Sequence, residues 1–259
     1  MSEHNDAENE RLVGGIGVPR RVGPYFSTED ADPATLAGYA AVNGRKVAGP
    51  GSGTWTRFGT DGGFELCAQP GGPVLAVLLD YEEPERFVNT SAAAFASCLR
   101  ELHAALRSLL TTDRPRWASQ AFDALSERLR AVDPAAFADR ERWWPRVLDD
   151  LRDTASVECY AAFEIVDARG DKQILTRSGG IAEHPEERLW QALRAAGVPP
   201  ERVLRVHTDL EPCFMPGHYC SMWLAEVLPH AEMTHVYPYG ETAESRADGL
   251  RRMEQAAAG

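Results

Sequence analysis

The chain has 259 residues, 44% of them hydrophobic, and a formal net charge of -12. A chain of this length is expected to form two domains of ordinary size. The negative charge argues against a protein that grips a long polyanion, because phosphate backbones are held mainly by Lys and Arg. Residues 156–259 contain 10 Lys and Arg against 16 Asp and Glu, so neither half of the chain is a basic module.

The chain has five cysteines at irregular spacing. An odd number argues against a disulfide framework and favours reduced thiols, some of which are then free to bind a metal. The sequence has no apolar run of the ~18 residues that a membrane-spanning helix needs, and its first residues do not resemble a signal peptide. We therefore expect a cytoplasmic protein that does not associate with membranes.

The first part of the chain is predicted to contain mainly strands and loops. Residues 1–10 are polar and charged, which predicts a disordered leader. Gly and Pro interrupt residues 14–53, so short strands and loops are expected there. In residues 54–80, turns at 61–63 and 70–72 separate three apolar runs, which predicts an antiparallel meander of three strands.

Three helices are predicted to follow the meander. The first is capped near residue 90 and is amphipathic. Apolar residues within 117–132 mark the second, and Pro145, a residue favoured at the start of helices, is predicted to open the third. The expected buried face of the first helix consists of Phe95, Leu99, Leu102, Leu106 and Leu109. Helical patterning changes to strand patterning near Thr154, so the predicted domains are residues 11–153 and 154–259.

The second domain is predicted to alternate strands and helices. Two apolar runs flank residues 167–171, which favours a hairpin. A helix over 185–196, a strand near 201–207, a helix carrying Cys220, a strand near 232–238 and a last helix over about 241–256 complete the order β-β-α-β-α-β-α. That order predicts an α/β fold with a sheet covered by helices.

The tripeptide His184-Pro185-Glu186 stands at the start of a predicted helix. Proline suits the first helical position, which makes His184 the N-cap. Trp190 and Leu193 follow Glu186 by four and seven residues, so helix phase predicts that the carboxylate faces inward. A buried carboxylate beside a metal can carry protons near neutral pH. The alternative is a chance pairing of His and Glu, in which the acidic residue only stabilises the helix dipole.

The second motif is Leu210-Glu211-Pro212-Cys213, which follows a predicted strand, with Cys220 at the start of the next helix. Two thiolates and one imidazole leave the fourth zinc position free for water, as is typical of catalytic zinc sites. The alternative is that both cysteines are small buried apolar residues.

The two motifs together resemble the cytidine deaminase-like superfamily, whose signature is H-x-E followed by P-C-x-x-C. The resemblance covers about residues 156–257 and implies a three-layer α/β domain with a mixed sheet. It implies Zn²⁺ as cofactor, with His184, Cys213 and Cys220 as ligands. It also implies that Glu186 carries protons between a zinc-activated water and the departing ammonia.

One feature departs from the signature, because six residues separate Cys213 and Cys220 instead of two. His218 within this loop is the alternative ligand to Cys220. The residues expected to form the wall of the substrate pocket are Thr208, Ser178, Gly179 and Gly180.

Residues 11–153 resemble the SUKH superfamily of immunity proteins, in its fourth subgroup. The resemblance rests on the segments GVPRRVGPYF, FVNTSAAAF, DPAAF and WWPRVLDDL. It implies an α+β binding domain of bacterial polymorphic toxin systems, in which such proteins neutralise toxins by binding them. The alternative is a generic α+β domain.

The sequence therefore predicts a SUKH-like domain that binds a toxin, fused to a zinc-dependent deaminase acting on a nucleotide or single-stranded nucleic acid. The alternative is a non-catalytic immunity protein, in which the deaminase fold is a scaffold for recognising a toxin. A zinc hydrolase of another class is disfavoured because the sequence has no H-E-x-x-H motif. The choice between cytosine and adenine stays open.

Overall fold

The computed structural model describes residues 10–49, 51–109 and 115–258. The chain divides into two compact units, Met1–Leu148 and Asp149–Gly259. The division falls inside helix α5 (Trp143–Ser156), five residues before the boundary expected from the strand pattern. Within the described residues, no helix combines the length and the apolar character needed to span a bilayer.

The first unit contains a six-stranded antiparallel sheet with strand order β3-β4-β5-β6-β7-β8. The predicted three-stranded meander is confirmed as β5 to β7. The predicted leader lies outside the described residues except for Glu10, which begins a separate hairpin. The strands are β1 (Glu10–Val13), β2 (Ile16–Pro19), β3 (Arg21–Val22), β4 (Phe26–Ser27), β5 (Thr56–Thr60), β6 (Glu65–Ala68), β7 (Val74–Val77) and β8 (Arg86–Asn89).

Among the described residues of this part of the chain, one α-helix lies between β4 and β5 and three α-helices follow β8. The predicted apolar face of α3 is buried, and the hydroxyl of Ser91 accepts a hydrogen bond from the N–H of Ala94 at 3.2 Å. Helix α5 begins at Trp143, two residues before the predicted start at Pro145. Proline is tolerated in the first turn because the N–H groups there have no intrahelical partner. The helices are α2 (Leu36–Val42), which was not predicted, α3 (Ala92–Leu109), α4 (Pro115–Val132) and α5.

The second unit has a four-stranded mixed sheet of order β10-β9-β11-β12. Strand β9 is antiparallel to both neighbours, whereas β11 and β12 are parallel. The order β-β-α-β-α-β-α is confirmed. The elements are β9 (Tyr160–Val166), β10 (Lys172–Ser178), α6 (Pro185–Ala195), β11 (Val203–Leu210), α7 (Cys220–Val227), β12 (Glu232–Tyr237) and α8 (Ala243–Ala258).

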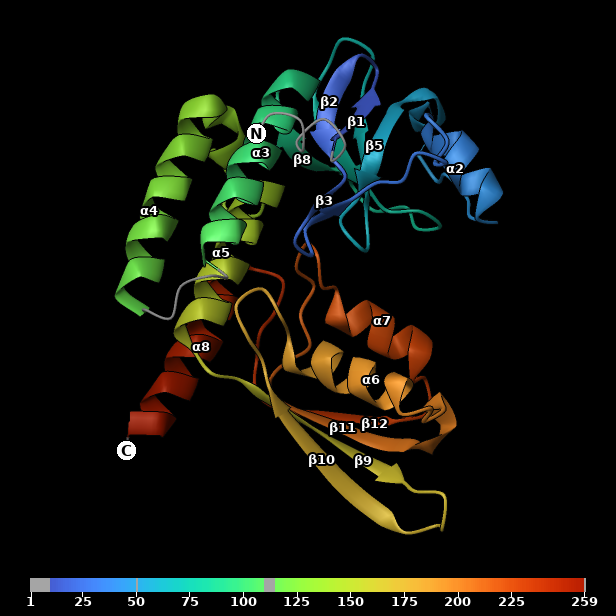
Figure 1. Ribbon diagram of the computed structural model, residues 1–259, viewed down its shortest axis with the longest axis vertical. Helices are drawn as coiled ribbons and strands as arrows, with labels where there is room; N and C mark the ends of the chain where they lie inside the picture. Colours follow the sequence, from blue (N-terminus) through green and yellow to red (C-terminus); the bar gives the residue numbers. More distant parts are fainter. Residues whose placement is uncertain (1–9, 50, 110–114, 259) are drawn as a thin grey trace, which may run out of the picture. The chain divides into compact units, whose positions relative to one another are not determined.

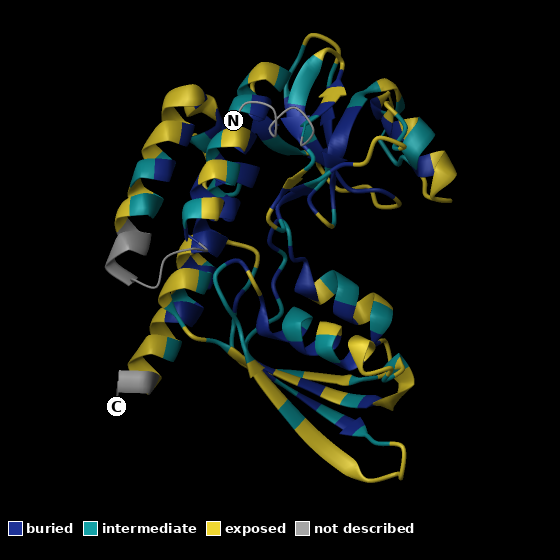
Figure 2. Ribbon diagram, in the orientation of Figure 1, coloured by how far each residue is buried: buried dark blue, intermediate teal, exposed yellow. Residues whose placement is uncertain are grey.

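The core of this unit lies between the sheet and helices α6 and α7 (Figure 1). Alternate residues of β9, namely Ala161, Phe163 and Ile165, are buried there together with Leu189 of α6 and Leu224 of α7. Strand β10 is an edge strand and is exposed along most of its length (Figure 2). The residues of the two sequence motifs lie at the starts of α6 and α7 and at the carboxyl end of β11.

Candidate metal centre and cavity

Three potential metal ligands converge in the second unit. The Nδ1 atom of His184 lies 3.4 Å from Sγ of Cys213 and 3.3 Å from Sγ of Cys220. Zinc–sulfur bonds of about 2.3 Å and zinc–nitrogen bonds of about 2.0 Å, at a tetrahedral angle, put sulfur and nitrogen about 3.5 Å apart. Two thiols and one imidazole at this separation therefore fit a zinc ion and leave a fourth position for another ligand.

Local backbone structure brings these ligands together. His184 is the N-cap of α6 and Pro185 its first residue, as predicted. Cys213 follows the end of β11, and Cys220 is the first residue of α7. The loop between the cysteines turns through Tyr219, whose φ of 43° lies in the left-handed region. The six-residue spacing thus allows both thiols to approach the same imidazole.

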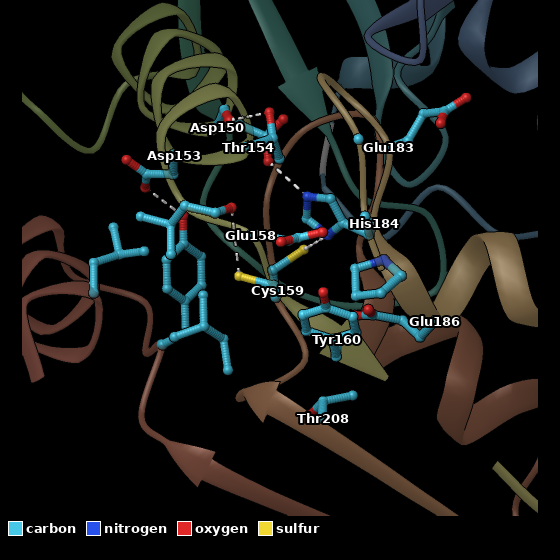
Figure 3. A pocket seen from close by; sticks show the side chains of 18 of the residues that line it. Asp150, Asp153, Thr154, Glu158, Cys159, Tyr160, Glu183, His184, Glu186 and Thr208 are labelled. Carbon is cyan, nitrogen blue, oxygen red and sulfur yellow. Dashed lines mark hydrogen bonds and ion pairs between the residues drawn. The ribbon is translucent and has the colours of Figure 1, made fainter. Parts of the chain in front are cut away.

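A cavity of about 330 Å³ reaches this cluster (Figure 3). Glu186, the second residue of α6, is 4% exposed and lines the cavity with His184 and Cys213. Trp190 and Leu193 are buried on the same face of α6, as helix phase predicts. The Glu186 carboxyl therefore faces inward, beside the potential ligands.

Three of the four residues expected in the wall of the substrate pocket lie at this cavity. Thr208, Gly179 and Gly180 line the cavity, whereas Ser178 does not. Ser178 ends β10, and its carbonyl oxygen accepts a hydrogen bond from Nη1 of Arg188 at 2.8 Å. The hydroxyl of Thr208 is buried and has no hydrogen-bond partner among the described residues. It is therefore available to a ligand in the cavity.

Several cavity residues were not predicted from the sequence. The hydroxyl of Tyr239, just after β12, donates to Oδ2 of Asp153 in α5 at 2.7 Å. The hydroxyl of Thr154 accepts from the N–H of Ala182 at 3.0 Å and so ties α5 to the loop that leads into α6. No local motif marks these residues, because their partners lie far away in the chain.

Burial governs the titration of the site. It raises the pKa of Glu186, an effect that the charge of His184 opposes. Burial would also raise the pKa of Cys213, but a hydrogen bond from Cys220 and the charge of His184 bring it well below its ordinary value. The neighbouring His184 therefore favours the thiolate form of Cys213, which is the form that binds a metal.

The wall of the cavity is acidic. Among the described residues that line it there is no Lys or Arg. Glu158 and Glu183 are exposed at the cavity, whereas Glu186 is buried. The carboxyl residues of the wall are Asp150, Asp153, Glu158, Glu183, Glu186 and Glu211.

The folds and the site define a protein of two parts, an antiparallel α+β unit followed by an α/β unit with a Cys₂His cluster. The chain belongs to the SUKH-4 immunity protein family, whose model matches residues 4–150, more than half of its length. Residues 156–256 match the model described as Xanthomonas-like deaminase. No curated protein and no solved structure gave a match. The predicted fusion of an immunity domain and a deaminase domain, in that order, is confirmed.

Proposed function

We propose that residues 154–259 form a three-layer, cytidine deaminase-like domain that hydrolyses the exocyclic amino group of cytosine or adenine. One observation carries this proposal. Within a segment that matches a deaminase family, a Cys₂His cluster and a buried glutamate line the same cavity. Residues 11–153 would then form the accompanying SUKH-like domain.

The side chains have distinct roles in this proposal. His184, Cys213 and Cys220 would hold the metal, and a zinc ion bound there would supply the activation of water at neutral pH. Glu186 takes a proton from the attacking water and delivers it to the leaving ammonia, a role that suits a buried carboxyl whose pKa is raised. The net reaction forms a C–O bond and breaks the C–N bond. The unpartnered hydroxyl of Thr208 is placed to orient the base.

The substrate that we propose is a nucleotide, a nucleoside or a single-stranded nucleic acid. The acidic cavity wall, without Lys or Arg among its described residues, disfavours a phosphate inside the cavity. The base would therefore enter without its phosphate. All five cysteines are free, which suits the reducing cytoplasm that we propose as the location.

The test is ammonia release by zinc-loaded protein from nucleosides, nucleotides, DNA and RNA. Glu186→Gln keeps the shape of the side chain and should abolish ammonia release while zinc stays bound. Glu201→Gln, at an exposed residue of a short helix (Pro200–Arg202), is the matched control and should leave both unchanged. Equal activity of Glu186→Gln and wild type would refute the role of Glu186.

Membership of the SUKH-4 family favours a second function, the binding and neutralisation of a toxin. In that case the deaminase fold could serve as a scaffold for recognising the toxin. Zinc-loaded wild-type protein that releases no ammonia from any of the four substrate classes would favour this function over catalysis. Binding of a toxin alone would not distinguish them, since both activities can coexist in one chain.

A further inference from the structure

The imidazole of His184 faces different partners at its two nitrogens. Nδ1 faces the thiols of Cys213 and Cys220. Nε2 lies 3.0 Å from Oδ1 of Asp150, and Figure 3 shows these two side chains pointing toward one another. A neutral imidazole that binds a metal through Nδ1 carries its proton on Nε2, and a carboxylate that accepts this proton's hydrogen bond fixes both the tautomer and the ring orientation. Asp150 occupies the position of such a partner.

The same carboxylate contacts a second imidazole. Oδ2 of Asp150 lies 3.3 Å from Nε2 of His218, and Nδ1 of His218 lies 2.8 Å from Oε2 of Glu187. The rings of His184 and His218 are stacked, with centroids 3.8 Å apart and planes 9° apart. His218 therefore packs on the face of the potential ligand, while Asp150 holds its edge.

Neither residue belongs to the motif by which the site was predicted. Asp150 is carried by α5, is 1% exposed, and precedes the segment 156–256 that matches the deaminase family. It is the last residue of the segment 4–150 that matches the SUKH-4 family. His218 lies in the loop that is four residues longer than the P-C-x-x-C signature allows.

We propose that Asp150 is a positioning residue that holds His184 in the metal-binding tautomer and orientation, and that His218 supports the ring from its face. This inference rests on the proposed function, because it concerns the same metal site. It means that the working site includes a residue, Asp150, outside the segment that the deaminase family defines. The longer loop between the cysteines has a purpose in this arrangement, since it supplies His218.

The experiment compares wild-type protein with Asp150→Asn, which keeps a hydrogen-bond acceptor, and Asp150→Leu, which has none. Zinc affinity is measured on the full chain by competition with a chromophoric chelator, without any substrate. Loss of an outer partner of a metal ligand typically costs about 10- to 100-fold in affinity. We expect a loss in this range for Asp150→Leu and a smaller loss for Asp150→Asn. His218→Gln should also weaken zinc binding.

The visible spectrum of the Co²⁺-substituted proteins provides a second readout. A change of ring orientation should shift the ligand-field bands of Asp150→Leu at saturating Co²⁺, whereas a purely structural role would leave them unchanged. Asp149→Asn is the matched control, because Asp149 neighbours Asp150 in α5 but pairs with Arg246 and Arg152. It should change stability without changing zinc affinity.

The outcomes separate this inference from the proposed function. Wild-type protein that fails to bind zinc would overturn the proposed metal site and this inference with it. Wild-type protein that binds zinc tightly, with equal affinity and an equal Co²⁺ spectrum in Asp150→Leu, would overturn the positioning role alone. If Asp150→Leu does not fold, the affinity and spectrum of Asp150→Asn decide in the same way.

Discussion

Glu65, a buried carboxyl in β6 of the first unit, should make the stability of this unit depend on pH. Its Oε2 atom accepts a hydrogen bond from Nε of Arg57 at 2.6 Å, and Nη1 of Arg57 also donates to Asp32 at 2.8 Å. Burial raises the pKa of Glu65 to about 7, although the charge of Arg57 opposes this effect. We expect the substitution Glu65→Gln to remove a defined part of the pH dependence of unfolding.

The sign follows from the two pKa values of Glu65. The value of about 7 in the folded protein exceeds the ordinary value of 4.5, so the folded state binds this proton more tightly than the unfolded state does. The resulting stabilisation is complete below about pH 4.5 and is lost as the pH rises through about 7. The difference corresponds to about 3 kcal/mol, of which about 2 kcal/mol is lost between about pH 5.5 and about pH 8.

The assay is urea unfolding followed by tryptophan fluorescence at several pH values in this range. The free energy of unfolding of wild-type protein should fall by about 2 kcal/mol more than that of Glu65→Gln. Glu82→Gln is the control, because Glu82 is exposed and should behave as wild type. If wild type and Glu65→Gln lose stability in parallel over the whole range, Glu65 does not have a raised pKa in the folded protein.

Three further predictions concern the second unit. A Cβ atom at Gly249 would lie 1.8 Å from the carbonyl oxygen of Pro238. The substitution Gly249→Ala should therefore lower the free energy of unfolding by about 3 kcal/mol. An unchanged melting temperature would contradict this prediction. Cys220→Ser should weaken zinc binding by more than the roughly 100-fold expected for loss of an outer partner of a ligand. The control Cys159→Ser should bind zinc as wild type does. Equal metal content of Cys220→Ser and wild type after dialysis against a chelator would exclude Cys220 as a ligand. The exposed carboxylates of Glu158 and Glu183 would each repel a phosphate charge ~8 Å away by roughly 0.5 kcal/mol in water, so a nucleoside should exceed its nucleotide about fivefold in kcat/KM. Glu158→Lys should lower the ratio of kcat/KM for the nucleoside to kcat/KM for the nucleotide. A wild-type protein that prefers the nucleotide would contradict the predicted repulsion.

Much of the fold could be predicted because it depends on short-range patterns. The apolar period of α3 and the turn between β9 and β10 are each contained in one stretch of sequence. Helix α2 was missed because it has only seven residues, lies among Gly and Pro, and contains Gly38. Its N-cap was a usable signal, since the hydroxyl of Thr35 accepts from the N–H of Gly38 at 3.2 Å.

The residues of the candidate site also differ in whether short-range sequence patterns could predict them. His184 and Glu186 could be predicted because a helix start and its phase fix where both side chains point. Asp150 could not be predicted, because an acidic residue in a helix usually faces solvent and its partner His184 lies 34 positions away. Burial of such a carboxyl is favourable only where hydrogen bonds compensate it. Its two imidazole partners are brought to it by the tertiary fold alone.

The loop between the cysteines shows how a departure from a sequence signature can leave the geometry of a site intact. The carbonyl oxygen of Cys213 accepts hydrogen bonds from both the N–H and the hydroxyl of Ser221 at 3.0 Å, which ties the start of α7 to the end of β11. The added residues fold inward between these fixed ends, since Met215 and His218 are buried. His218 reaches Asp150 and Glu187 through its ring nitrogens, so it joins the carboxylates instead of the thiols. In the site that we propose, Cys220 is therefore the ligand instead of His218, and the longer loop adds a partner to the site without removing one.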